Sequence, residues 1–421
     1  MFWGQGFSSM LFKIATFVLL LFVFYKRNVF SKSVSLSSRL MCFKKSLSVA
    51  IIICFFYSIN SWAQLENKTL SYDLPINNAD SNKLFFGVNT LNYLRNTEYF
   101  GPIEAGKTTF GYALNPKLIY YPNSFVRIDF GGFFRKDFGN DKFKIVSPTF
   151  SVKIAKNGYA VIFGNYESAL SHRFIEPLFN IEYAITKPLE SGFQFKVIKK
   201  RVFSDTWVDW QKMIYNGSPF KEEINAGTTN FINVFGADKR FKSDLIYQAI
   251  VHHSGGQIDV LRTIPLTTMV NMASGLRFSY HFADSTFFKE LRTDNYFVTY
   301  SESSSQIRNP YKNGHGLYFN VLLKTKLLNF MASYWKASHY VATNGTPLYQ
   351  SVNTVDFGQS MVRLPQRELL FLRVFYEKDI AKDLKLDVRF EPFYEFNRKV
   401  VDFSYSVYLR YNINVKLADI K

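Results

Sequence analysis

The stretch "DFSYSVYLRYNINVKL" (Asp402–Leu417) alternates apolar or aromatic residues with mostly polar ones along its whole length. Because a strand turns successive side chains to opposite faces, the pattern predicts a strand with one oily and one wet face. Strands of soluble domains average about 5–6 residues, whereas a tilted strand crosses a bilayer in about 9–11 and often continues beyond it. The stretch therefore raises a membrane β-barrel as the first hypothesis. A long hairpin of a soluble β-sandwich is the alternative.

Composition agrees with a barrel. Aromatic residues make up 18% of the 421 residues, yet the mean hydropathy is only −0.07. These values exclude a helical membrane protein and suit a barrel whose polar lumen offsets its apolar outside. Both cysteines, Cys42 and Cys54, lie near the N-terminus, which excludes a disulfide scaffold or a thiolate metal site in the rest of the chain.

The segment that begins at Met41 has the parts of a secretory signal peptide. Lys44 and Lys45 form its positive start, residues 47–59 its apolar core, and Ser61-Trp62-Ala63 a small-x-small cleavage site. An uncleaved anchor is the alternative, because the charge-free run from 46 to 65 is just long enough to span a bilayer.

The first 40 residues carry a second apolar run, Ile14–Tyr25, which makes two export signals in tandem. We therefore expect 1–40 to be an extension upstream of the true start, 41–63 to be the signal peptide and 64–421 to be the barrel. A genuine N-terminal anchor is the alternative for 1–40. Residues 1–63 hold seven of the 51 basic residues and no acidic one, so the remainder keeps 44 against 33, a net charge of +11. This excess favours anionic partners, and export argues against nucleic acid.

Sixteen segments after residue 64 show the period of a strand, and none shows a sustained helical period. We expect an all-β, antiparallel, up-and-down transmembrane barrel of about 16 strands, within a range of 14–18. The predicted strands are 83–94, 107–121, 124–136, 142–156, 158–168, 177–188, 191–204, 226–238, 241–254, 271–283, 291–302, 314–326, 327–341, 366–379, 382–397 and 400–417.

The connections between these strands alternate in length. Short turns follow even-numbered strands, at 121–124, 155–158, 188–191, 236–243 and 378–382. Long gaps follow odd-numbered strands, at 205–225, 255–270, 303–313 and 342–365. Bacterial outer-membrane barrels sort their periplasmic turns and outer loops in this way, whereas a sandwich has no reason to.

Charges fall on one face of these strands. In one of them Val126 and Ile128 would face lipid, with Arg127 and Asp129 on the opposite face. A charged side chain that faces lipid at mid-membrane costs about 2–4 kcal/mol. In hydrocarbon every backbone N–H and C=O group must also be paired within the protein. Charged side chains are therefore expected in the lumen of a closed sheet.

The chain resembles outer-membrane β-barrels of Gram-negative bacteria, in the Bacteroidota style and porin-like. The likeness is carried by the leader ending Ala63-Gln64, the aromatic-rich amphipathic strands and the alternating last strand. It implies the cell outer membrane, with its lipid and lipopolysaccharide as surroundings, and a monomer or homo-oligomer. One departure is that four residues, "ADIK", follow Leu417, where many such barrels end on an aromatic residue.

Five arginines form the first candidate site. A ladder of inward arginines lowers the barrier for an anion in a pore. The alternative is that they brace a packed interior by pairing with acids on the same strands, namely Asp129, Asp387, Glu377, Glu391 and Glu395. The predicted lumen arginines are Arg127, Arg277, Arg373, Arg389 and Arg410.

Two tryptophans form the second candidate site. Trp207 and Trp210 lie in "SDTWVDWQK", just after a predicted strand. On an outer loop they would stack on sugar rings, with Asp205 and Asp209 binding hydroxyl groups. The alternative is the aromatic girdle found at the membrane interface of any barrel.

Histidines give weaker signals. His172 with Glu176, or His252 with His253, has no spacing specific for a metal, and His281, Ser301 and His315 form no recognisable nucleophile–base motif. We therefore predict no metal site, no cofactor and no enzymatic activity.

The sequence favours a channel that passes small, anionic or sugar-like solutes through a lumen narrowed by inward side chains and by a folded-in loop such as 342–365. Two alternatives stay open. One is a plugged structural or secretion-associated barrel that binds a partner through its outer loops. The other is an outer-membrane barrel hydrolase.

Overall fold

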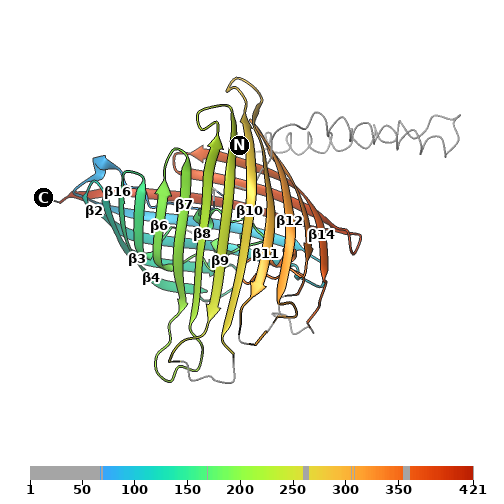
Figure 1. The fold of residues 1–421 in the computed structure, drawn as a ribbon. Helices are drawn as coiled ribbons and strands as arrows, with labels where there is room; N and C mark the ends of the chain where they lie inside the picture. Colours follow the sequence, from blue (N-terminus) through green and yellow to red (C-terminus); the bar gives the residue numbers. More distant parts are fainter. Residues whose placement is uncertain are drawn as a thin grey trace, which may run out of the picture. The chain divides into compact units, whose positions relative to one another are not determined.

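The computed structural model describes residues 67, 70–167, 169–258, 265–304, 306, 307, 309–353 and 361–420. They form a single closed antiparallel barrel (Figure 1). Its strands are β1 (Lys83–Glu98), β2 (Lys107–Asn123), β3 (Val126–Asp137), β4 (Ile145–Lys156), β5 (Tyr159–Asn165), β6 (Ser191–Ile198), β7 (Val202–Lys212), β8 (Glu223–Phe235), β9 (Phe241–Ser254), β10 (Thr267–His281), β11 (Phe288–Glu302), β12 (Asn313–Thr325), β13 (Asn329–Ser338), β14 (Gln366–Ala381), β15 (Leu384–Glu395) and β16 (Val400–Asp419).

The first and last strands close the barrel. β1 pairs with β16 from Lys83 opposite Asp419 to Glu98 opposite Phe403, and every other strand pairs with its sequence neighbours. Closure leaves no unpaired sheet edge, which is the condition for spanning hydrocarbon with strands. The predicted fold class, a sixteen-stranded up-and-down barrel, is confirmed.

Two errors in the predicted strands cancel in the count. The segment 177–188 is not a strand: it belongs to a loop and carries one helical turn, α3 (Tyr183–Thr186). The segment predicted as 191–204 contains two strands, β6 and the start of β7, joined by a tight turn. The predictions for residues 1–63 lie outside the described residues.

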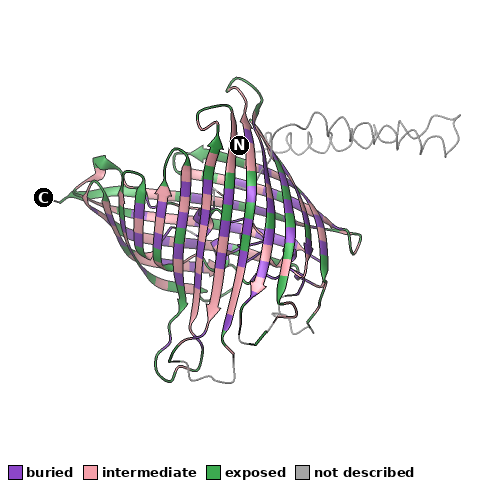
Figure 2. Cartoon of the chain, in the orientation of Figure 1, coloured by how far each residue is buried: buried purple, intermediate pink, exposed green. Residues whose placement is uncertain are grey.

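The predicted alternation of faces is confirmed along most strands, where buried and exposed positions alternate (Figure 2). On β3 the Arg127 side chain is 4% exposed and Phe130, on the other face, is 63% exposed. On β16 the polar residues Ser404 and Ser406 are buried, and Tyr405 lies on the exposed face. The apolar face therefore points outward and the charged face points into the lumen.

Connection lengths also follow the prediction. Short turns join even strands to the next odd strand, such as β4 to β5, and longer loops emerge at the opposite end. We call the end of the barrel with the short turns the turn end, and the opposite end, with the longer loops, the loop end. Within the described ranges, no helix is long and apolar enough to cross a membrane. The short helices are η1 (Asn78–Asp80), η2 (Ala169–His172), α3 and η3 (Pro347–Tyr349).

Candidate functional site

The loop from β5 to β6, residues 166–190, fills the lumen, and we call it the plug loop. Its Glu176 reaches the opposite wall, where the carboxylate accepts hydrogen bonds from Arg373 on β14 (2.6 Å) and from the Tyr349 hydroxyl (2.6 Å). Tyr318 on β12 donates a third, at 3.3 Å. One loop carboxylate thus ties the plug loop to β12, β14 and the β13–β14 loop, which follow it by more than 140 residues.

Ion pairs continue from this anchor across the lumen. Arg373 lies 3.2 Å from Glu391, and Glu391 lies 3.2 Å from Arg95 on β1. Arg95 in turn contacts Glu182 of the plug loop at 3.2 Å. The charges alternate from Glu176 to Glu182, so the middle of the plug loop is held by one buried network.

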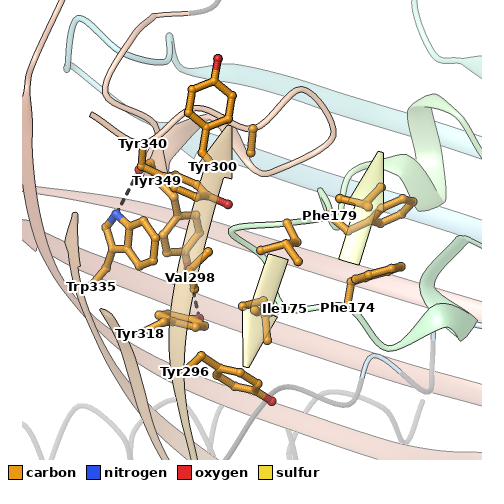
Figure 3. Close-up of a cluster of buried hydrophobic side chains, with 14 of the residues drawn as sticks. Phe174, Ile175, Phe179, Tyr296, Val298, Tyr300, Tyr318, Trp335, Tyr340 and Tyr349 are labelled. Carbon is orange, nitrogen blue, oxygen red and sulfur yellow. Dashed lines mark hydrogen bonds between the residues drawn. The ribbon is translucent and has the colours of Figure 1, made fainter. Parts of the chain in front are cut away.

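Aromatic packing supports the same arrangement. Phe174, Ile175 and Phe179 of the plug loop lie near a group of buried side chains from β11, β12 and the β13–β14 loop (Figure 3). The Trp335 indole donates to the Tyr349 carbonyl at 3.0 Å, and the Tyr340 hydroxyl donates to the Pro177 carbonyl at 2.9 Å. The β13–β14 loop, part of which was expected to fold inward, thus packs on the plug loop.

His172 is the charged centre of the plug loop. Its Nδ1 lies 3.0 Å from Asp205 and its Nε2 lies 3.0 Å from Glu190, and the ring stacks on Trp207 at 4.6 Å. Burial alone would lower the pKa of His172, but the two carboxylates raise it to about 9. Because both ring nitrogens are engaged, this histidine holds the loop in place and has no nitrogen left for a substrate.

A second segment closes the lumen nearer the turn end. Residues 70–77, the N-terminal segment, run inside the wall, where Arg410 donates to the carbonyls of Leu70 (2.5 Å) and Ser71 (2.9 Å). Arg127 donates to the Pro75 carbonyl at 3.0 Å. Two cavities beside Tyr72 measure about 30 and 20 Å³, room for one or two water molecules each.

The predicted lumen arginines are all held by protein partners. Arg127 pairs with Asp129 (2.7 Å), Arg277 with Asp294 (2.6 Å) and Arg389 with Asp387 (2.5 Å). Arg373 and Arg410 bind the two lumen-filling segments as described above. The arrangement matches the bracing alternative, and anion binding by these arginines stays a prediction. Of the predicted acids, Glu395 pairs with Arg367 and Glu377 accepts a bond from Asn329.

Trp207 and Trp210 lie within β7 and not on an outer loop, because the strand extends to Lys212. Their spacing of three puts them on opposite faces. The Trp207 side chain is 1% exposed and stacks on His172 in the lumen. The Trp210 side chain is 42% exposed and lies on the outer face, near the loop end. Only Trp210 has the position of a girdle residue, and the two rings cannot stack on one sugar.

The weaker histidine signals of the sequence correspond to no assembled site. Glu176 binds Arg373 and not His172, while His281 and His315 lie at opposite ends of the barrel. Across the described residues, no three His, Cys, Asp or Glu side chains are grouped to hold a metal ion. His252, at the end of β9, faces inward and bonds to Asn225, a pairing that sequence spacing did not indicate.

The fold and the filled lumen define the class: an outer-membrane β-barrel whose interior is occupied by its own chain. The model of the lipid A 3'-O-deacylase-type family matches residues 76–420, and the chain belongs to this family. The prediction of no enzymatic activity is therefore wrong, since the family is one of enzymes. The absence of a recognisable sequence motif had suggested otherwise.

Similar solved structures are also outer-membrane proteins. OprD of Pseudomonas aeruginosa is 9% identical, with 82% of this chain and 97% of that chain covered and a TM-score of 0.44. A loop-deleted OmpT of Vibrio cholerae is 10% identical, with 78% and 99% covered and a TM-score of 0.46. No curated protein matches the sequence. The Bacteroidota style and the porin-like character stay predictions.

Proposed function

We propose that this protein is an outer-membrane hydrolase that removes an ester-linked acyl chain from a lipid A-type glycolipid. The observation that carries the proposal is the family match over residues 76–420. In the reaction, water oxygen bonds to the ester carbonyl carbon and the bond to the sugar oxygen breaks. The products are a free carboxylic acid and a sugar hydroxyl.

The filled lumen favours chemistry at a rim over passage of a solute. Inward side chains such as Arg389 (2% exposed) and Gln248 (0% exposed) are covered by the protein itself. Barrels of this type turn their longer loops outward, so the loop end would face the outer leaflet, where lipopolysaccharide resides. A glycolipid reaches that rim by lateral diffusion, without crossing the barrel.

A channel for small anionic or sugar-like solutes is the second candidate. The observation in its favour is the strand number, because barrels of about 16–18 strands are wide enough for an aqueous pore. Such a pore requires the plug loop and the N-terminal segment to leave the lumen. Their many buried contacts count against this candidate.

The test is turnover of a defined lipid. Purified folded protein is mixed with lipid A in detergent micelles, and the lipid is followed by mass spectrometry. The expected result is a mass loss of one acyl chain with an equal yield of free fatty acid. Lipid A stripped of ester-linked chains, which keeps only its amide-linked chains, is the control and stays unchanged. Intact lipid A after prolonged incubation with folded protein would contradict the proposal.

A further inference from the structure

A histidine and two asparagines meet at the loop end of the barrel. His252 on β9 lies directly opposite Asn225 on β8, and its Nδ1 is 2.8 Å from the Asn225 Oδ1. It follows Gln248 and Ile250 on the inward face. Asn225 is buried and bonds to Asn344 of the β13–β14 loop. Two neighbouring strands and a loop residue 119 positions beyond Asn225 therefore orient one imidazole.

The asparagine pair fixes which nitrogen of His252 carries the proton. Asn225 donates its amide N–H to the Asn344 Oδ1 (3.1 Å), and Asn344 donates back to the Asn225 Oδ1 (3.2 Å). The Asn225 Oδ1 is an acceptor only, so the His252 Nδ1 must be the donor. In the neutral ring the proton then sits on Nδ1 and the lone pair on Nε2. Within the described chain, Nε2 has no hydrogen-bond partner.

We infer that His252 is the general base of this barrel and that its substrate is the ester of a long acyl chain. The inference rests on the proposed function and deepens it. Nε2 takes a proton from water as the water oxygen bonds to the ester carbonyl carbon. The resulting imidazolium returns that proton to the departing sugar oxygen as the carbon–oxygen bond breaks. Protons and electrons balance without any co-reactant.

The remaining histidines do not have this arrangement. His172 has both nitrogens engaged, and His253 points outward with its Nδ1 2.9 Å from Thr268. His281 is at the turn end and His315 is exposed on the outer face. His339 contacts the hydroxyl of its neighbour Ser338, a group that can donate or accept and so fixes no tautomer.

Apolar loops next to His252 suit an acyl chain. The β7–β8 loop follows Lys212, the β9–β10 loop follows Ser254, and the Gly255 amide joins them by donating to the Glu222 carbonyl at 3.0 Å. These loops carry large apolar side chains that are 42–74% exposed. They are Met213, Tyr215, Ile258 and Leu266. A polar, oriented base beside exposed apolar surface matches a substrate with a sugar head and a hydrocarbon tail.

The experiment compares His252→Gln with His253→Gln, a change at the next residue on the same strand but on the opposite face. Both variants are first shown to fold by their melting temperatures. With lipid A in micelles, we expect His252→Gln to lower kcat by about 10²–10⁴-fold with little change in KM. His253→Gln should match the wild type. Wild-type activity should rise with pH as the His252 imidazole loses its proton.

A second variant tests the orienting role. Asn225→Ala keeps the His252 ring but removes the acceptor that fixes its tautomer, so kcat should fall by about 10-fold while the rise with pH is retained. If His252→Gln turns over lipid A as fast as the wild type, the assignment of the base is wrong and the proposed function stands. If the wild type itself releases no fatty acid, the proposed function fails and this inference fails with it.

Discussion

Buried charges inside this barrel come in sets rather than isolated pairs. His172 sits between Glu190 and Asp205, and Lys196 lies 4.0 Å from Asp205. Removing one member of such a set leaves charges buried without compensation, which costs about 3–5 kcal/mol. The contribution of this set to holding the plug loop thus depends on the protonation of the His172 ring.

His172→Gln should destabilise the barrel in a pH-dependent way. The pKa of His172 is raised from its unfolded value of 6.5 to about 9. The stabilisation is therefore fully present below about pH 6.5 and is lost as pH rises through about 9. Melting temperatures in detergent should differ by the most near pH 6.5 and converge above pH 9. A difference in melting temperature between wild type and variant that increases with rising pH would contradict this account.

The strands of the wall were predictable because a membrane-spanning strand must alternate apolar and polar side chains. Val126 to Asp129 had to place apolar side chains toward lipid, and the faces of their side chains follow from that requirement alone. The plug loop obeys no such rule. Phe179, Ile181 and Ile185 have a strand-like spacing, yet each is buried within the lumen by contacts from elsewhere in the chain. A period of two therefore misidentified the segment 177–188 as a strand.

Glu176→Gln should loosen the plug loop without opening the wall. The change weakens the bonds from Arg373, Tyr318 and Tyr349, and hydrogen bonds to charged groups are worth about 1.5–3 kcal/mol. Hydrogen exchange should become faster at the Ile175 amide, which now donates to Gln248 at 3.0 Å, and stay unchanged in β9.

The matched control for the plug-loop prediction is Glu368→Gln. Glu368 pairs with Lys336 at 3.9 Å on the outer face, where both side chains are partly exposed. Exchange in the plug loop should not respond to this change. Equal exchange at Ile175 in the wild type and in Glu176→Gln would show that the carboxylate does not hold the loop.

Closure and the two ends of the barrel followed from the sequence, and the strand number was right only because two errors cancelled. The state of the lumen did not follow from the sequence. Arg373 and Arg389 were expected inside on alternation alone, and both are buried there. Their partners in the filled lumen, Glu176 and Asn67, are 197 and 322 residues away in sequence. No local pattern encodes contacts over such separations. The same holds for the pairing of Asn225 with Asn344, which are 119 residues apart.

The filled lumen predicts a barrel that conducts poorly until the plug loop is removed. Asn165 and Ser191 are already paired across β5 and β6, so a short Gly-Ser turn replacing residues 168–187 should leave the wall intact. In planar bilayers the wild type should be silent or nearly so. The deletion variant should give ohmic steps with anion preference, because Arg95 and Arg373 lose Glu182 and Glu176 as partners.

Two comparisons make the conductance experiment decisive. Shortening the exposed β3–β4 loop by deleting residues 139–142 alters a surface connection of the same barrel and should leave the wild-type silence unchanged. Removing the N-terminal segment (70–77) together with the plug loop should enlarge the steps further, because Arg410 and Arg127 then face an unobstructed lumen. Steps of equal size in the wild type and in the plug-loop deletion would mean that the loop does not occlude the pore in a membrane. A solute channel would then explain the barrel better than a closed enzyme.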